Sequence, residues 1–270
     1  RAHHADIGGD TPGSMPLASR LSDEGLIIAP QYISRDGKLE PETVGLLNEN
    51  LRTPDRTLGD IFSQISANKT GVKRTHSLIY KYGIDGFFSA TNEMSEYSEL
   101  LARRTIKSIP NGVYSATDVM DGDGLGDNDI TISVTITIDG ECAKVNFGGT
   151  AQSVSGNINC PVSVTAAAVY YVFYTLMPRD TPASYGSLKP IAIEAPKGCL
   201  VNAIAPSACA AGNVETSQRL VDVLLLALSE AIPDRIPASS QGTMNNLAMG
   251  NQHWNYYETI GGGTGGHSAG

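Results

Sequence analysis

Ile130-Thr131-Ile132-Ser133-Val134-Thr135-Ile136-Thr137-Ile138, followed by Asp139-Gly140, is the stretch of sequence that decides the fold class. Aliphatic side chains occupy every second position, which places them on one face of a strand and the Thr and Ser hydroxyls on the other. Asp139-Gly140 is typical of a two-residue hairpin turn, and Ala143, Val145 and Phe147 alternate again after it. The sequence therefore predicts a β-hairpin over 130–148 with one buried face.

Helical spacing dominates the residues before this hairpin. A short helix is expected from Pro41 through Leu51, a longer one from Pro54, and a third over Glu93–Ser108, with a short strand at Leu26–Ala29 among the first loops. The apolar face expected for the second helix consists of Leu58, Ile61, Ile65, Val72 and Ile79, and its solvated side consists of Lys69, Lys73, Arg74 and Lys81.

The residues after the hairpin contain two segments that are apolar on nearly all sides. Pro161–Met177 and Val214–Ala231 are long enough to be buried helices, and Leu188–Ala195 and Trp254–Tyr257 are expected to be strands. The predicted fold class is α/β mixed (α+β), with a helical first third, then a β-hairpin and strands packed with long buried apolar helices. Since there is no internal repeat or low-complexity linker, residues 1–270 are expected to form a single domain.

Composition excludes several classes of function. The net charge of -9 and the sequence pI of about 5.0 leave no basic field for nucleic acid. The longest apolar run, Ala166–Tyr174, is too short to cross a bilayer. Four cysteines without a C-x-x-C pair indicate a reduced, cytoplasmic protein. Charged residues make up 17% of the chain, against the usual ~25%, so we expect an oligomer that covers much of this surface.

The two ends of the sequence do not resemble natural termini. The chain opens at Arg1 without a methionine and closes in a glycine-rich run, so we expect it to be a window on a longer chain.

His3-His4-Ala5-Asp6 is the densest cluster of metal-capable and proton-transferring groups. Adjacent side chains on an extended segment point to opposite faces, so one histidine is the expected metal ligand and the other an acid or base. From spacing alone, a structural pair of histidines is the simpler interpretation.

Acidic residues also gather over Asp121–Asp129. The calcium-loop pattern fails, because Leu125 occupies a carboxylate position and Ile132 stands where a glutamate is required. A solvated loop before the strand is the prediction.

Two polar segments near the end of the chain have both a structural and a functional interpretation. The first segment is Ala211–Arg219. In the structural interpretation, Asn213 caps the following helix and Glu215 interacts favourably with the positive end of the helix dipole. In the functional interpretation, Thr216, Ser217 and Gln218 line a polar pocket. In the second, 261–266, glycines allow either phosphate binding or a simple turn, and no P-loop lysine follows. Ser240 has no His or Asp at a diagnostic spacing, which argues against a serine hydrolase.

Seven stretches keep one order along nearly the whole chain. They are Arg1-Ala2-His3-His4-Ala5-Asp6-Ile7-Gly8-Gly9, Thr11-Pro12-Gly13-Ser14-Met15-Pro16, Asn50-Leu51-Arg52-Thr53-Pro54-Asp55, Asn159-Cys160-Pro161, Ala211-Gly212-Asn213-Val214-Glu215-Thr216-Ser217-Gln218-Arg219, Ser240-Gln241-Gly242-Thr243-Met244-Asn245-Asn246 and Tyr257-Glu258-Thr259-Ile260-Gly261-Gly262-Gly263. Together they resemble the hydantoinase B family, which includes the B-type component of N-methylhydantoinase, the C-terminal part of 5-oxoprolinase, lactam hydrolases and large subunits of acetone and acetophenone carboxylases. The resemblance implies one hydantoinase B-type domain over 1–270, cut at both ends.

The resemblance also implies a site. Family members carry a divalent metal, zinc or manganese, and His3 resembles one ligand; the others lie in upstream segments, including an H-x-P-D motif, that this sequence lacks. His4 and Asp6 are then candidates for supporting the metal ligands or for proton transfer. The implied substrate-facing residues are Glu215, Thr216, Ser217, Gln218, Arg219, Gly261, Gly262 and Gly263.

The implied partner is a hydantoinase A-type ATPase subunit in a hetero-oligomer. That subunit uses ATP to phosphorylate the carbonyl oxygen of a cyclic amide, and a metal-bound water then attacks the carbon. Ring opening of a hydantoin, 5-oxoproline or lactam is the leading interpretation. An acetone carboxylase-like ATP-dependent ligase and a non-catalytic scaffold are the alternatives.

Overall fold

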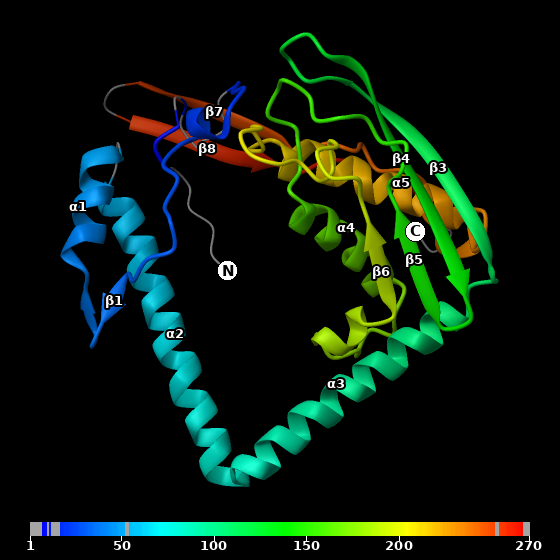
Figure 1. The fold of residues 1–270 in the computed structure, drawn as a ribbon, viewed down its shortest axis with the longest axis horizontal. Helices are drawn as coiled ribbons and strands as arrows, with labels where there is room; N and C mark the ends of the chain where they lie inside the picture. The colour runs from blue at the N-terminus through cyan, green and yellow to red at the C-terminus, as the bar shows by residue number, and fades with distance from the viewer. Residues whose placement is uncertain (1–6, 10, 12–16, 52–53, 252–253, 267–270) are drawn as a thin grey trace.

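The computed structural model describes residues 7–9, 11, 17–51, 54–251 and 254–266. Figure 1 shows two bodies of different size joined by two long helices that meet in a V. The larger body holds a mixed sheet and its covering helices, and the smaller one surrounds the start of the first long helix. None of the helices in these ranges is both long and apolar enough to span a bilayer.

A four-stranded sheet forms the larger body. Its strands are β3 (Gly112–Gly122), β4 (Asn128–Asp139), β5 (Cys142–Asn146) and β6 (Ile191–Glu194), in that spatial order. β3, β4 and β5 are antiparallel neighbours, whereas β6 pairs in parallel with β5. Asp139 pairs with Cys142 around a turn in which Gly140 has a φ of 58°, so the predicted hairpin is confirmed.

The alternation in β4 places its aliphatic side chains in the core. Residues 130, 132, 134, 136 and 138 are at most 3% exposed, and burial of each side chain stabilises the fold by about 1.5–3 kcal/mol. α5 (Ser217–Ser229) packs against β3, β4 and α4 (Val162–Thr175). Both helices were predicted from their apolar character, and the mixed fold class is confirmed.

The two long helices were predicted only in part. α2 (Pro54–Tyr82) begins at Pro54 as expected, and α3 (Ile84–Lys107) begins nine residues before the predicted start at Glu93. Gly83 joins them with a φ of 75°. The apolar face expected for α2 is confirmed at Leu58, Ile61 and Ile65, which contribute to one core, and is wrong at Val72, which is 59% exposed.

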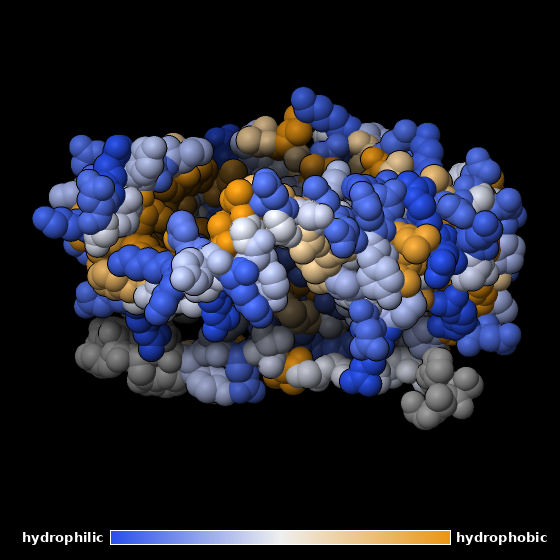
Figure 2. Space-filling view, turned by 90° about the horizontal axis from the view of Figure 1, so that it is seen from below, coloured by the Kyte–Doolittle hydropathy of each residue, from blue (hydrophilic) through white to orange (hydrophobic). Residues whose placement is uncertain are grey.

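The smaller body has its own core. α1 (Pro41–Asn50), the short hairpin of β1 (Ser34–Arg35) and β2 (Lys38–Leu39), and the start of α2 enclose Leu47, Leu51 and Ile61. In the view from below, apolar surface gathers in a hollow over these elements (Figure 2). The strand expected at Leu26–Ala29 is wrong, because this segment lines the hollow without pairing along its length.

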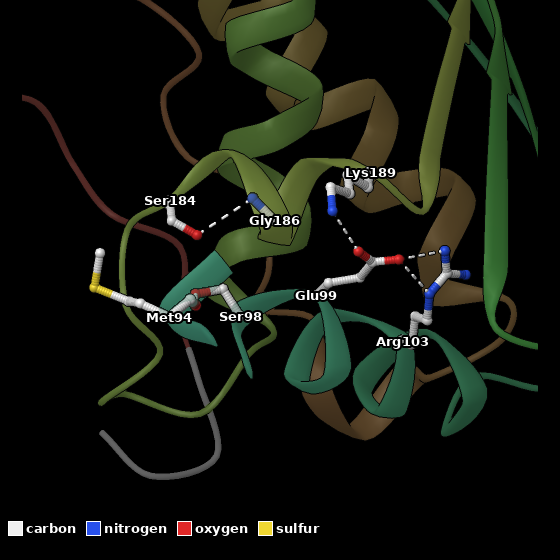
Figure 3. Close-up of polar contacts among 7 residues, drawn as sticks. All are labelled: Met94, Ser98, Glu99, Arg103, Ser184, Gly186 and Lys189. Carbon is white, nitrogen blue, oxygen red and sulfur yellow. Dashed lines mark hydrogen bonds and ion pairs between the residues drawn. The ribbon is translucent and has the colours of Figure 1, made fainter. Parts of the chain in front are cut away.

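The C-terminal half of α3 is fixed to the larger body (Figure 3). Glu99 bonds to Lys189 at 2.8 Å and to Arg103 at 2.7 Å, and the buried Ser98 hydroxyl donates to the Pro182 carbonyl. A Cβ on Gly186 would lie 2.7 Å from the Ser95 carbonyl carbon, so the backbones touch. The loop over 182–189 therefore anchors α3.

The last elements are a two-stranded ribbon of β7 (Asn245–Asn251) and β8 (Trp254–Ile260). The ribbon extends from the larger body toward the smaller one across the top of Figure 1. β8 confirms the aromatic strand predicted at Trp254–Tyr257, and β6 occupies the centre of the strand predicted over Leu188–Ala195.

Candidate functional site

A groove of about 800 Å³ runs between α4 and α5. This volume is within the range of small-molecule sites, roughly 300–1,000 Å³. Its walls are a stripe of α4, a stripe of α5, and the segments 235–240 and 264–265. Aliphatic and aromatic side chains form much of the lining, and the polar side chains that face it are Ser163, Thr175, Asn213, Ser217, Gln218, Asp222, Arg235, Ser240 and Thr264.

The start of α5 is shaped by a π-helical turn, Gly212–Thr216. Gly212 is required there, because a Cβ would overlap the Asn159 carbonyl oxygen and lie 2.9 Å from its carbon. The buried Cys160 thiol donates to the Gly212 carbonyl at 3.1 Å, and burial raises its pKa well above the usual range. Such single π turns occur frequently at functional sites. This one packs the start of α5 against Asn159 and Cys160, which directly precede α4.

Asn159 and Asp123 hold the loop under this turn. The buried Asn159 amide donates to the carbonyls of Val154, Gly156 and Ala208, and its oxygen accepts from the Val154 N–H. The Asp123 carboxylate accepts four backbone N–H bonds, from Leu125, Gly126, Asp127 and Gly156. Although burial by itself raises the pKa of Asp123, these bonds together lower it.

The prediction of a solvated acidic loop is wrong at Asp123, which is 3% exposed. The backbone amides of the turn replace water around this carboxylate, so burial does not leave it without partners.

A second buried carboxylate ties the early part of the chain to the same region. Glu24, 6% exposed, accepts from the N–H groups of Cys209 and Ala210 at 2.7 and 2.6 Å. Burial raises the pKa of Glu24 despite these two bonds. Burial also raises the pKa of the Cys209 thiol, to about 11. All four cysteines are free thiols.

The residues predicted to face substrate in the π turn and at the start of α5 occupy four environments. Ser217 and Gln218 line the groove. Thr216 lies in the core, where its hydroxyl donates to the Ile158 carbonyl. Glu215 is partly buried, which raises its pKa. Arg219 donates to Asp118 of β3 at 2.7 Å. Contact of these residues with substrate stays a prediction.

The expected capping role of Asn213 is wrong. No side-chain bond caps either the π turn or α5, because the helical backbone is already continuous from Gly212. The Asn213 side chain lines the groove, and its carbonyl accepts from the Ser217 hydroxyl at 2.6 Å.

Gly261, Gly262 and Gly263 lie in a segment that runs along residues 238–241. The Gln241 N–H donates to the Gly263 carbonyl at 3.2 Å, and a side chain on Gly262 would collide with Gln241. A Cβ on Gly261 or Gly263 would meet no atom within 4 Å, whereas a Cβ on Gly265 would overlap the Ala238 carbonyl oxygen. Gly265 therefore permits the close approach of the two segments, and this packing brings Thr264 and Gly265 to the groove wall. A direct contact with substrate is untested.

Asp222 is a groove residue that no sequence motif indicated. It is partly buried, which raises its pKa, and attraction to Arg219 offsets part of this effect. The Ser240 hydroxyl lies 3.5 Å from its Oδ1. Within the described ranges Asp222 forms no ion pair, because the Arg219 guanidinium pairs with Asp118.

The predicted metal ligand His3, and the predicted proton-transfer residues His4 and Asp6, lie outside the described residues. Over the part of the chain that the structure covers, no group of three or more His, Cys, Asp or Glu side chains is arranged to hold a metal ion. The described residues therefore do not by themselves supply a metal centre.

Comparisons with known proteins agree with the sequence motifs. The model of the family described as hydantoinase B/oxoprolinase matches residues 1–270. The chain is 37% identical to 5-oxoprolinase of Dictyostelium discoideum over 98% of its own length, and 32% identical over the same share to a putative D-/L-hydantoinase component, of the B type, from a Pseudomonas species. The solved ATP-dependent caprolactamase of Pseudomonas jessenii superimposes with a TM-score of 0.87 at 25% identity over 95% of this chain.

These relatives are longer proteins. The chain spans about half of the hydantoinase component (47%) and of the caprolactamase chain (45%), and about a fifth of the 5-oxoprolinase (21%).

Proposed function

Because the chain belongs to the hydantoinase B/oxoprolinase family, we propose that it takes part in ATP-dependent hydrolysis of a cyclic amide C–N bond, with the ring held in the groove between α4 and α5. The observation that carries this proposal is the position of Ser217 and Gln218, which belong to a family-like motif and line this groove. The similarity to a 5-oxoprolinase, a putative hydantoinase and a caprolactamase supports the reaction class.

The groove offers the two kinds of surface that a cyclic amide needs. Val164, Ala168 and Leu225 provide apolar contact for ring methylenes. An amide group also carries one N–H donor and one carbonyl acceptor, and Gln218 can complement both. The Ser217 hydroxyl already bonds to the Asn213 carbonyl, so its remaining capacity is that of an acceptor for the ring N–H.

The activation step is assigned to a partner. We propose a hydantoinase A-type ATPase subunit that uses ATP to phosphorylate the carbonyl oxygen, in a hetero-oligomer with this chain. The zinc or manganese ligand proposed at His3, and proton transfer by His4 and Asp6, depend on residues beyond the described ranges. Analysis of bound metal in wild type and His3→Ala tests that separate assignment.

The experiment combines the purified protein with its ATPase partner, ATP and a cyclic amide, and measures ADP and the ring-opened product by mass spectrometry. Ser217→Ala is compared with Ser229→Ala, because each hydroxyl donates to a backbone carbonyl of its own helix and Ser229 lies outside the groove. Loss of a neutral hydrogen bond predicts a kcat/KM about tenfold lower for Ser217→Ala and nearly unchanged for Ser229→Ala.

Three results would contradict the proposal. Bicarbonate-dependent ATP use without a ring-opened product would indicate the carboxylase alternative. Assembly with the ATPase but no turnover would indicate the scaffold alternative. Equal kcat/KM values for the two serine variants would remove the ring from this groove.

A further inference from the structure

We propose that Asp222 and Arg235 bind the amine and the carboxylate of the ring-opened product, so that the groove selects cyclic amides that carry no charge of their own. This inference rests on the proposed function, because it specifies which cyclic amides the groove accepts. Two side chains of opposite charge, Asp222 and Arg235, line the same groove.

The two charges lie at different levels of the groove. The bond from Cys160 to Gly212 joins the segments that precede α4 and α5, and the Arg235 guanidinium donates to the Leu176 carbonyl at the far end of α4 at 2.7 Å. Asp222 lies in the second turn of α5, which begins at Ser217, whereas Leu176 directly follows the last residue of α4, Thr175. The two charges therefore face the groove at different points along its length.

The surroundings of Asp222 favour a cationic ligand. Its carboxylate is partly desolvated, its hydrogen-bond partners are the hydroxyl and the backbone N–H of Ser240, and the neighbouring guanidinium of Arg219 is engaged by Asp118. The negative charge is therefore only partly compensated by the protein. An ammonium group at this position would form a charge-assisted hydrogen bond, which is roughly twice as strong as a neutral one.

Arg235 has donors to spare for a carboxylate. Its guanidinium donates to the Leu176 carbonyl and, at 3.3 Å, to the Ser108 hydroxyl. These two bonds use only part of the five N–H donors of an arginine, whose planar fork matches a carboxylate. The side chain is exposed and lines the groove, so a ligand there can reach it.

The product of ring opening has the charges that this arrangement complements. Hydrolysis breaks the amide C–N bond, the oxygen of water joins the acyl carbon, and a proton joins the nitrogen. One neutral ring becomes one chain with a carboxylate and an ammonium at its ends. 4-Aminobutanoate, the product of 2-pyrrolidinone, is such a chain.

A charged ring is expected to bind less well. 5-Oxoproline is 2-pyrrolidinone with a carboxylate beside the ring nitrogen, and this nitrogen becomes the amine. The added carboxylate would therefore lie near Asp222, where like charges repel in a partly desolvated groove. The two compounds differ in this one group, so they form a matched pair of substrates.

The first experiment measures binding to the purified protein by calorimetry, with 4-aminobutanoate, butanoate and butan-1-amine as probes. We expect the amino acid to bind about tenfold more tightly than either singly charged probe. Asp222→Asn should remove the tighter binding of 4-aminobutanoate relative to butanoate, because the amine loses its partner. Arg235→Gln should remove the tighter binding of 4-aminobutanoate relative to butan-1-amine, because the carboxylate loses its partner. Glu230→Gln and Arg179→Gln, exposed residues outside the groove, are the matched controls and should bind as the wild type does.

Folding is checked separately. Because the pKa of Asp222 is raised, its ionised form opposes folding at neutral pH, so unliganded Asp222→Asn should melt no lower than the wild type. A second experiment compares kcat/KM for 2-pyrrolidinone and 5-oxoproline. We expect about a tenfold preference for the uncharged ring, reduced in Asp222→Asn.

The outcomes separate this inference from the proposed function. Ring opening of cyclic amides without charge-dependent binding of 4-aminobutanoate would overturn the inference and leave the function standing. Charge-dependent binding of 4-aminobutanoate without turnover of any cyclic amide would overturn the proposed function and leave the assignment of Asp222 and Arg235 standing. Equal effects of Asp222→Asn and Glu230→Gln on binding, or a preference for 5-oxoproline that Asp222→Asn leaves unchanged, would also overturn the inference.

Discussion

Substitution of Gly212 by alanine tests how the start of α5 is positioned. The added Cβ would overlap the Asn159 carbonyl oxygen, lie 2.9 Å from its carbon and lie 3.1 Å from the Cys160 sulfur. Two of these atoms belong to a backbone that Asn159 holds through four hydrogen bonds of its side chain. Neither α5 nor this loop can move without breaking bonds, so the clash is expected to persist as strain.

Overpacking of this kind costs about 1–3 kcal/mol, and a carbonyl that cannot yield places Gly212→Ala near the upper end. The gain in helix propensity from Gly to Ala, about 1 kcal/mol, offsets part of the cost. We therefore expect a net loss of ~1–2 kcal/mol in the free energy of unfolding, measured by urea denaturation. Ser217 and Gln218 should move with the turn, so kcat/KM should fall as well.

Gly71→Ala is the matched control. Gly71 lies in the interior of α2, and a Cβ there meets no atom within 4 Å, so only the propensity gain applies. This variant should be more stable than the wild type by about 0.5–1 kcal/mol. If Gly212→Ala is as stable as Gly71→Ala, the close packing at the start of α5 is not what holds the turn.

Two further predictions concern charged groups away from the groove. Asp123→Asn should lower the free energy of unfolding by about 1–3 kcal/mol, because an amide cannot accept all four backbone N–H bonds. Because folding lowers the pKa of Asp123, the ionised carboxylate stabilises the fold fully above its unfolded pKa, and this stabilisation is lost as the pH falls through its folded pKa. The free energies of unfolding of wild type and Asp123→Asn should therefore converge in acid denaturation, and a difference that stays constant with pH would refute this. Glu99→Gln should cost less than about 1 kcal/mol, because its pairs with Lys189 and Arg103 are partly exposed, and a thermal melt that shows unfolding of α3 would contradict this.

The sequence was most informative where one pattern specified one element. The alternation of Ile130 to Ile138 was sufficient for the hairpin, because a one-residue shift would expose the whole aliphatic face. The apolar runs of α4 and α5 were long enough to identify buried helices. β3 is not evident from the sequence, because Asp118 occupies an inward position and Val113 and Val119 lie on the exposed face, which obscures the alternation. Its position in the sheet comes from pairing with β4.

The candidate site was predicted less completely. Ser217 and Gln218 belong to a motif that the family resemblance had already indicated. Asp222 and Arg235 carry no local signal, since only the packing of α4, α5 and residues 235–240 brings them to one groove. The Asp123 loop was misjudged for the same reason: its partner Gly156 lies 33 residues further along the chain.

A crystal structure of the protein with 4-aminobutanoate tests the central claim most directly. The account predicts electron density for the ligand between α4 and α5, with its amine at Asp222 and its carboxylate at Arg235. Density for the ligand elsewhere on the protein, with this groove containing only water, would contradict the account.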